Sequence, residues 1–569
     1  MKFSSCVGVL CALSLTACGG GGSGGSDAGA TPAGSGAATV VMPLQLSDPT
    51  APTTVETGTS IQFGGGQCTG GSGVLTVSWS FGDGTKLSNT NAHIYASPGQ
   101  YSVSVSCTDS GTKQTLSTLP ITVTVTPLTP HGFLGRAWST YQTVDTHNTS
   151  IYPLGGLATD GKVYGAWLQN LGSGSGVASG RLDSVTEKAW TLEGLIPFGG
   201  TPVTFNNLVS SPRIGPLDLA VSPQGKVLVA WVAGSSLWYA LRTPEGGWSL
   251  PIQTAVSPSS ATIKVAVNDA GDGAIAYCTA GGAQVVKVTR GSMVVSVPQQ
   301  ISARCSSMVG YTGAGLQLAR GFDVAIDNAS SAIHAVGLMP SPSEVGKSQV
   351  VMFRHLPDSG WAAPEPVSAV LPTTSFGSTF SLSYSLAPAG QYAGVAWSQS
   401  GDGSLSNAYA RLSDGGTWSA ITALQTNNSL AYALPLIAVN DDGKAFVAMA
   451  MDDKTRLSYF MYVSNYSPAA GWMASPVKAN TWGGFAAVDV AIDQFGNGLV
   501  THCDIGVDTV AGTLSAAGGW SGLKAITPLY GNGSFHYQAM RALPDGRAIL
   551  MTSVYASTGF ASSGFVLLQ

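Results

Sequence analysis

The sequence predicts an all-β protein, in which a small β-sandwich is followed by a β-propeller. Only 10% of the 569 residues are charged, and 74 are glycine. From about residue 42 to 126, apolar and polar residues alternate in short segments separated by glycine and aspartate, which is typical of sandwich strands. From about residue 131 onward one cassette of strands and turns repeats. A unit of this kind cannot bury its apolar faces alone, so the repetition indicates a propeller or a solenoid.

Residues 1–17 have the pattern of an export signal. Lys2 supplies a positive charge, residues 3–15 are mainly apolar, and Leu15-Thr16-Ala17-Cys18 follows. The Leu-Thr-Ala-Cys sequence resembles the bacterial lipobox, which implies that Cys18 is acylated and becomes the mature N-terminus. An ordinary signal peptide with a chance cysteine is the alternative. The residue after the cysteine is Gly19 and not aspartate, which resembles lipoproteins sorted to the outer membrane. The resemblance implies a place in the cell envelope, at the surface or in the periplasm.

Residues 18–41 are nearly all small or polar, a composition that predicts a flexible tether. Beyond the signal, no run reaches the roughly twenty apolar residues of a transmembrane helix. We therefore expect the N-terminal lipid to make the membrane contact. The net charge is -5 and no basic run occurs, so the electrostatic pattern of a nucleic-acid-binding protein is missing.

Residues 42–127 are expected to form the sandwich, with strands over 76–81, 101–107 and 121–125. Trp79 and Phe81 alternate onto the core face, and Gly82-Asp83-Gly84 permits a tight turn. Together with His93-Ile94-Tyr95 and the Pro-Gly-Gln-Tyr-Ser-Val segment at 98–103, these residues resemble a PKD domain. The resemblance implies an immunoglobulin-like fold, common in bacterial surface proteins and exoenzymes. For Asp83 we favour a turn-capping role over calcium binding.

The eight cysteines divide into three groups. Cys6 and Cys11 leave with the signal, and Cys18 takes the lipid. Of the other five, Cys68 and Cys107 are expected to form a disulfide, since export favours oxidation. A second bond between Cys278 and Cys305 is feasible and is left open. Cys503 is expected to be a buried free thiol. The spacings match no zinc pattern, and we expect no metal and no cofactor.

Each cassette contains a short apolar strand, a glycine turn, two further strands and Gly-Trp-Ser, as in residues 218–249. Its tryptophan recurs at Trp190, Trp248, Trp361, Trp418, Trp472 and Trp520, and Met293 takes this place in one copy. A residue needed in every copy favours packing between blades over stacking on sugars. The repeats resemble uncharacterised bacterial surface propellers, as residues 491–497 and 518–520 show well.

The copies number eight. Their turn glycines are Gly161, Gly225, Gly271, Gly390, Gly443, Gly496 and Gly546, with a degenerate copy near Ser331. An extra Trp138-Ser139 precedes the first complete cassette, and the last copy stops at residues 565–568 without such a segment. We therefore expect residues 131–569 to form eight four-stranded blades closed by the N-terminal strand, with seven blades as the alternative.

Strand order predicts that tight turns lie on one face of the propeller and long connections on the other. The chain would enter at the tight-turn face. Because binding loops project from rigid scaffolds, we expect a glycan or protein ligand at the long-loop face. The polar and aromatic candidates there are Asn206, Asn207, Arg213, Tyr311, Arg320, Trp482 and His536.

Three recurrent aspartates, Asp218, Asp323 and Asp489, start the first strands of their cassettes, and we expect each to bond a neighbouring blade. His502 occupies the position of Trp231 in the repeat and is expected in the core.

No catalytic residue is assigned. A glycosidase needs two carboxylates that flank the bond, whereas the acidic residues here are few and mostly at turns, and neither Gly-x-Ser-x-Gly nor His-Glu-x-x-His occurs. The leading hypothesis is a surface-anchored, non-catalytic binding or adhesion lipoprotein. The alternatives are an exported glycan-active hydrolase or lyase and a scaffold for envelope assembly.

Overall fold

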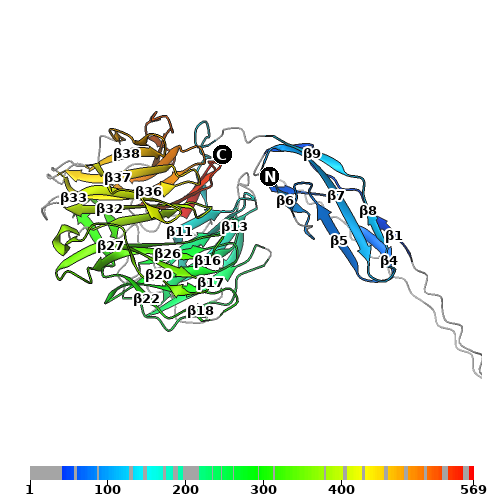
Figure 1. Cartoon of the computed structure of the whole chain (residues 1–569), viewed down its shortest axis with the longest axis horizontal. Helices are drawn as coiled ribbons and strands as arrows, with labels where there is room; N and C mark the ends of the chain where they lie inside the picture. Colours follow the sequence, from blue (N-terminus) through cyan, green and yellow to red (C-terminus); the bar gives the residue numbers. More distant parts are fainter. Residues whose placement is uncertain are drawn as a thin grey trace, which may run out of the picture.

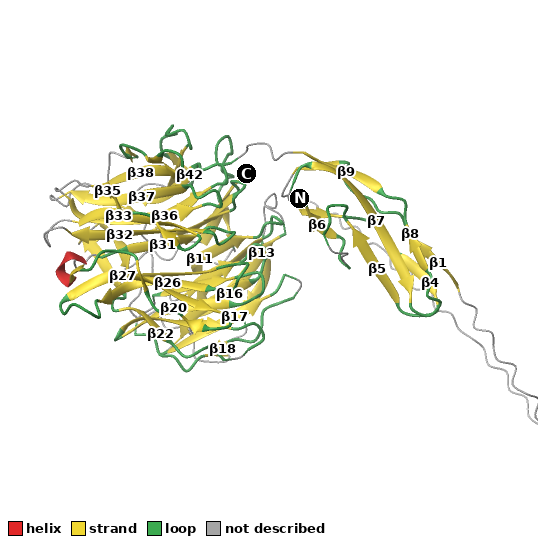
Figure 2. Ribbon diagram, in the orientation of Figure 1, coloured by secondary structure: helices red, strands yellow, loops and turns green. Residues whose placement is uncertain are grey.

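The computed structural model describes most of the chain from residue 42 onward, almost all of it strand and loop (Figures 1 and 2). The described residues are 42–56, 60–85, 89–95, 97–126, 132–144, 150–170, 175–183, 190–196, 217–233, 235–244, 246–259, 262–292, 294–311, 314–376, 380–400, 406–425, 430–453, 459–479, 485–504, 509–527, 536–554 and 563–569. Over these ranges the one helix is the short 3-10 turn η1 (Thr373–Phe376), and no helix there is long and apolar enough to cross a bilayer.

The N-terminal unit consists of two layers of strands. Its strands are β1 (Met42–Leu46), β2 (Thr54–Glu56), β3 (Ser60–Gln62), β4 (Cys68–Gly71), β5 (Leu75–Ser80), β6 (Ala92–Ile94), β7 (Gly99–Asp109), β8 (Thr115–Ser117) and β9 (Ile121–Thr126). One sheet has the order β2-β9-β7-β5, with β8 also on β7, while β1 pairs with β4 and β3 with β6. Trp79 and Phe81 are 3% and 2% exposed in the core between them, as their alternation predicts.

Two contacts tie the layers of this unit together. Cys68 and Cys107 form a disulfide, with Cα atoms 6.2 Å apart. The carboxylate of Asp109 accepts hydrogen bonds from the backbone N–H groups of Ser72, Gly73, Gly111 and Thr112 and from the Thr112 hydroxyl. These bonds, that from Ser72 foremost, hold the pKa of Asp109 well below its usual range.

Asp83 caps its own turn. Its Oδ1 accepts hydrogen bonds from the Thr85 N–H and hydroxyl, and its Oδ2 lies 2.7 Å from His93 Nε2. Across the described part of the chain, no group of three or more His, Cys, Asp or Glu side chains could hold a metal ion.

The C-terminal region contains, in its described residues, eight antiparallel sheets of at least four strands. The first four in chain order are β11–β14 (Ser150–Leu157, Val163–Asn170, Ser175–Leu182, Thr191–Leu195), β15–β18 (Leu217–Val221, Val227–Ala233, Ser236–Arg242, Ile252–Gln253), β19–β22 (Ile263–Val267, Gly273–Thr279, Gly282–Val288, Gln299–Ser302) and β25–β28 (Phe322–Ile326, Ile333–Pro340, Lys347–Leu356, Gly360–Trp361), the last with β29 (Glu365–Pro366) and β30 (Leu371–Pro372) on β27.

The remaining sheets are β31–β34 (Leu382–Leu386, Tyr392–Ser400, Ser406–Asp414, Thr417–Trp418) with β35 (Thr422–Gln425), β36–β39 (Leu430–Val439, Ala445–Asp453, Tyr459–Ser467, Gly471–Trp472) with β40 (Val477–Lys478), β41–β44 (Phe485–Ile492, Gly498–Asp504, Thr509–Leu514, Lys524–Ala525), and β45–β47 (His536–Ala542, Ala548–Val554, Ser563–Leu568) joined by β10 (Gln142–Thr143). A hairpin, β23 (Ser306–Tyr311) and β24 (Ala314–Arg320), lies between β22 and β25 and contacts β31 and β41.

The first strands of successive sheets pack side by side, and β45 of the last sheet packs on β11 of the first. We call each of these contacts between neighbouring sheets a seam. At three seams a carboxylate of one sheet accepts a hydrogen bond from the next sheet. Val265 N–H donates to Asp218 at 2.8 Å, Tyr384 N–H to Asp323 at 3.1 Å and Met540 N–H to Asp489 at 3.0 Å. The expectation that these aspartates bond the neighbouring sheet is therefore confirmed.

The turns between first and second strands form a second layer of contacts. Each predicted turn glycine has φ between +69° and +90°, and Ser331 takes the same region at 58°, although non-glycine residues seldom adopt it. Backbone or side-chain donors in one turn reach the next at almost every seam. The pairs of residues are Arg547–Thr159, Thr159–Pro223, Gln224–Asp269, Asp269–Asn328, Ala389–Asp441, Asn440–Asp493 and Gln494–Pro544.

The Gly-Trp-Ser motif begins the fourth strand through a reciprocal pair of hydrogen bonds. Ser249 N–H donates to the carbonyl of Leu241, and its Oγ accepts the Leu241 N–H at 3.1 Å. Ser419 pairs with Leu412 and Ser521 with Thr513 in the same manner. In the sheet β19–β22 the position of the tryptophan is held by Val295, bridged to Val288. The assignment of that place to Met293, which lies outside the described residues, is therefore wrong.

The N-terminal strand uses the same motif on the C-terminal strand. Trp138 bridges Leu568, and Ser139 exchanges both hydrogen bonds with Leu567. Just before it, Phe133 N–H donates to Asp493 at 2.8 Å and Arg136 to the Asp545 carbonyl at 2.9 Å. The chain thus enters this region beside the tight turns, as expected.

Replacing Asp218 by alanine should lower the free energy of unfolding. The side chain is 8% exposed, so its loss leaves the Val265 N–H buried without an acceptor, at a cost of about 1–3 kcal/mol. Chemical denaturation followed by circular dichroism measures this change. Asp218→Asn should recover part of the loss, and Asp358→Ala, at an exposed turn, should have almost no effect. Equal losses in all three variants would contradict the role of the seam bond.

Candidate ligand-binding site

The candidates on the long-loop face fall largely outside the described residues. Asn206, Asn207, Arg213 and Trp482 lie there, as does Cys18. Tyr311 ends β23, Arg320 ends β24 and His536 begins β45. Whether these residues form one site stays a prediction.

On the long-loop face, the residues that follow β22 are held by a disulfide and by a hydrogen bond. Cys278, at the end of β20, and Cys305 form a disulfide with Cα atoms 5.5 Å apart, and Arg304 donates to the Phe376 carbonyl at 3.0 Å. The hairpin β23–β24 follows. Because β24 contacts β41, four sheets further along the succession, the hairpin reaches across the centre of the arrangement.

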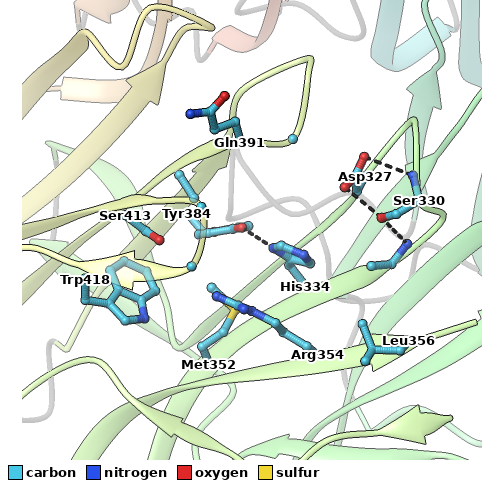
Figure 3. A pocket seen from close by; sticks show the side chains of 15 residues that line it. Asp327, Ser330, His334, Met352, Arg354, Leu356, Tyr384, Gln391, Ser413 and Trp418 are labelled. Atoms are coloured by element: carbon cyan, nitrogen blue, oxygen red, sulfur yellow. Dashed lines mark hydrogen bonds between the residues drawn. The ribbon is translucent and has the colours of Figure 1, made fainter.

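A pocket opens on the opposite, tight-turn face, between the sheets β25–β28 and β31–β34 (Figure 3). Its volume is about 210 Å³. The first sheet contributes its first turn, β26 and β27, and the second contributes β31 to β34 and both of its turns. The residues that line it are Asp327, Ser330, Ala332, His334, Met352, Arg354, Leu356, Tyr384, Gly390, Gln391, Ala393, Ser413, Gly415, Gly416 and Trp418.

Two buried donors in this pocket lack an acceptor. Neither Arg354 Nε nor Trp418 Nε1 has a hydrogen-bond partner. Figure 3 shows the Arg354 side chain extending across the pocket toward Trp418. Arg354 Nη2 lies 3.3 Å from the Glu365 carboxylate, which holds one end of the guanidinium. Both nitrogens are fully buried, and the indole nitrogens of Trp190 and Trp248 at the same position of other sheets are unpaired as well, so the missing acceptor reflects the packing of the repeat and not the pocket.

His334 and Tyr384 join the two sheets behind the pocket. His334 Nδ1 and the Tyr384 hydroxyl lie 2.7 Å apart, and Tyr384 N–H donates to Asp323. Burial lowers the pKa of His334 to about 4, with the nearby Arg354 charge adding to the effect. Burial also raises the pKa of the Tyr384 hydroxyl well above its usual value. Both side chains are therefore neutral at physiological pH.

The rim of the pocket is polar and partly made of glycine. Asp327 accepts hydrogen bonds from the Ala329 and Ser330 N–H groups and from the Ser330 hydroxyl. Gln391 donates to Asp414 at 3.0 Å. A Cβ at Gly416 would lie 3.1 Å from Arg354 Nη1, so a side chain there would crowd the guanidinium.

This seam differs from the others because both of its turns are one residue longer. Asp327 N–H donates to the Ala332 carbonyl and Ala387 N–H to the Tyr392 carbonyl, whereas the corresponding Asn268 N–H donates to the Asp272 carbonyl, one residue nearer. Asn328 is bonded to Asp269 of the preceding sheet, as Asp441 is to Ala389 at another seam. Among the described residues, no hydrogen bond joins the turn 327–331 to the turn 387–391. The pocket occupies the space that this leaves.

Sequence reasoning missed the pocket. The sequence predicts that Trp418 packs between blades, and it does pack against the core cluster between its own sheet and β25–β28. Arg354 carried no motif. The one available signal was the degenerate turn near Ser331. His502 is 2% exposed, which confirms its place in the core, while Cys503 lies at the end of the same strand, β42.

The buried His334 predicts a pH-dependent stability. The pKa of His334 is about 4 in the folded protein and 6.5 in the unfolded chain. The contribution of neutral His334 to the free energy of unfolding is therefore fully present above pH 6.5 and is lost as the pH falls toward 4. The loss is on the order of 3 kcal/mol. Denaturant unfolding at a series of pH values should show a flatter dependence for His334→Gln over that range. Identical slopes for the two proteins would contradict the assignment.

Several solved structures are similar to this chain at low identity. The match to the polysaccharide lyase Uly1 covers 75% of this chain and 98% of the lyase chain, at 9% identity and a TM-score of 0.41. The lectin BP39L from Burkholderia pseudomallei covers 70% and 98%, at 14% identity and a TM-score of 0.40. A protein of unknown function from Dyadobacter fermentans covers 77% and 99%, at 12% identity and a TM-score of 0.35. Among curated proteins, none matches. Residues 46–125 match the PKD domain family, so the chain carries a PKD domain ahead of its repeated sheets.

Proposed function

We propose that this protein is an exported lipoprotein that binds a glycan or a protein ligand without transforming it. In this proposal Cys18 carries the lipid after removal of residues 1–17, residues 18–41 form the tether, and residues 42–127 form the PKD unit. Residues 131–569 close into an eight-bladed propeller that presents the ligand site. The cell envelope, and within it the outer membrane, is the proposed location.

The pairing of the chain ends supports the closed ring. Ser139 and Leu567 exchange two hydrogen bonds, and β45 packs on β11. Because the first and last strands share a sheet, that sheet joins the two ends of the succession, and its outer edge is the short strand β10.

The pocket is the observation that carries the binding function. It combines the Trp418 indole with the polar side chains of Arg354, Asp327 and Gln391. Small-molecule sites have this character, with a few placed polar groups on a preformed hollow.

The acidic residues favour binding over hydrolysis. Asp327 is the one carboxylate lining the pocket, and three donors of its own turn occupy it. Asp218, Asp323 and Asp489 are bonded across seams. A glycosidase needs two carboxylates that flank the scissile bond, and the described pocket does not supply them.

Lipid attachment is tested by labelling cells with a radioactive fatty acid. The wild-type protein should take up the label and stay with the membrane fraction, whereas Cys18→Ser should remain unlabelled. Protease added to whole cells then separates surface from periplasmic display. A labelled Cys18→Ser protein would contradict anchoring at this residue.

Ligand binding is tested with the purified mature protein on a glycan array, followed by chromatography of the bound glycan. We expect retention of specific glycans that are recovered unchanged. Recovered fragments, with an unsaturated or a reducing new end, would instead support the lyase or hydrolase alternative. Failure to bind any glycan, together with failure to bind a protein on whole cells, would contradict the proposal and favour an envelope scaffold.

A further inference from the structure

We infer that the pocket between the sheets β25–β28 and β31–β34 binds one neutral sugar ring. This inference rests on the proposed binding function and gives the chemical class of the ligand. It also places the site on the tight-turn face rather than among the long loops.

The volume limits the ligand to a small group. Pockets for drug-sized molecules measure roughly 300–1,000 Å³, whereas this one measures about 210 Å³. A single ring at the end of a glycan, or one ring bent out from a chain, suits the space better than an extended oligosaccharide.

The polar side chains that line the pocket suit a ligand with several hydroxyl groups. Arg354 and Trp418 reach the pocket from strands of different sheets, β27 and β34. Hydroxyl oxygens of a sugar accept hydrogen bonds, and its hydroxyl hydrogens can be donated to the Asp327 and Gln391 oxygens at the rim. The Trp418 indole supplies an apolar, polarisable surface beside them.

The charges around the pocket select a neutral ligand. Arg354 is paired with Glu365, and Arg411 lies over the Trp418 ring, 5.8 Å from its centroid. Against these two cations stand Glu365, Asp327 and Asp414, which touch the pocket or its lining residues. His334 is neutral. A carboxylate or phosphate group would therefore enter a region of net negative charge, which is unfavourable.

The glycines keep the entrance open. Gly415 and Gly416 both have positive φ, at 53° and 90°, and form the turn that leads into Trp418. A side chain at Gly416 would press on Arg354, and a side chain at Gly390 would press on Asp327. Both turns of the sheet β31–β34 thus place glycine, the smallest residue, at the opening.

The test uses the full mature chain and two matched sugar pairs, glucose with glucuronate and galactose with galacturonate. Saturation-transfer NMR detects weak binding, and calorimetry gives the dissociation constants. We expect at least one neutral sugar to bind and its uronate to bind at least tenfold more weakly. Tighter binding of the uronates or of inorganic phosphate than of the neutral sugars would overturn the inference. So would a complete lack of binding, both of the two neutral sugars and of every glycan that ends in a neutral ring.

Variants locate the site. Trp418→Phe reduces the aromatic surface beside the pocket, and Arg354→Gln removes the guanidinium, so each should weaken binding by tenfold or more. Trp472→Phe changes the same repeat position in the sheet β36–β39 and should leave binding unchanged. Circular dichroism and thermal unfolding verify that each variant folds. If Arg354→Gln does not fold, the binding measured for Trp418→Phe decides the test. If the protein binds glycans on the array but both pocket variants bind like the wild type, this inference fails while the proposed function stands.

Discussion

The C-terminal region depends on hydrogen bonds between one sheet and the next. A sheet of four strands exposes two apolar faces, and packing against its neighbours buries them, but packing alone does not specify the angle or the register between sheets. The seam bonds do so. Asp218, Asp323 and Asp489 each accept a backbone N–H from the adjacent sheet, and the turns add contacts such as Gln224 to Asp269. A buried N–H that loses its partner costs free energy, so each seam is held in one geometry.

The pocket arises where this pattern of contacts is interrupted. At the seam between β25–β28 and β31–β34, the inner bond of Asp323 to Tyr384 is present, but the longer turns at 327–331 and 387–391 make no hydrogen bond to each other. The two sheets are bonded at their centre, and at one end their turns lie close together without a hydrogen bond between them. A rigid hollow lined by Arg354 and Trp418 is the result. Function is thus placed at a local departure from the repeat, on a scaffold that the repeat makes stiff.

Repetition explains which parts of this arrangement the sequence could predict. The aspartates at the first strands recur, so a structural role in every copy was the natural interpretation, and the seam bonds confirm it. The Trp138-Ser139 segment was identified as the missing fourth strand of the last copy, and it pairs with Leu567 and Leu568. The pocket could not be predicted in this way, because Arg354 belongs to no motif and the effect of one added residue in each of the turns near Ser331 and Gly390 depends on contacts between two sheets. In the copy without tryptophan, the register pointed to Met293, whereas the bridge is made by Val295.

We propose that the ligand occupies the tight-turn face at this one seam. Hydrogen–deuterium exchange of the mature protein, with and without a saturating glycan, tests this placement, because backbone protection reports the bound face without any substitution. Exchange should become slower in residues 327–334, 387–393 and 413–418 and stay unchanged in 197–216 and 303–321. Protection confined to the two long-loop segments would contradict it.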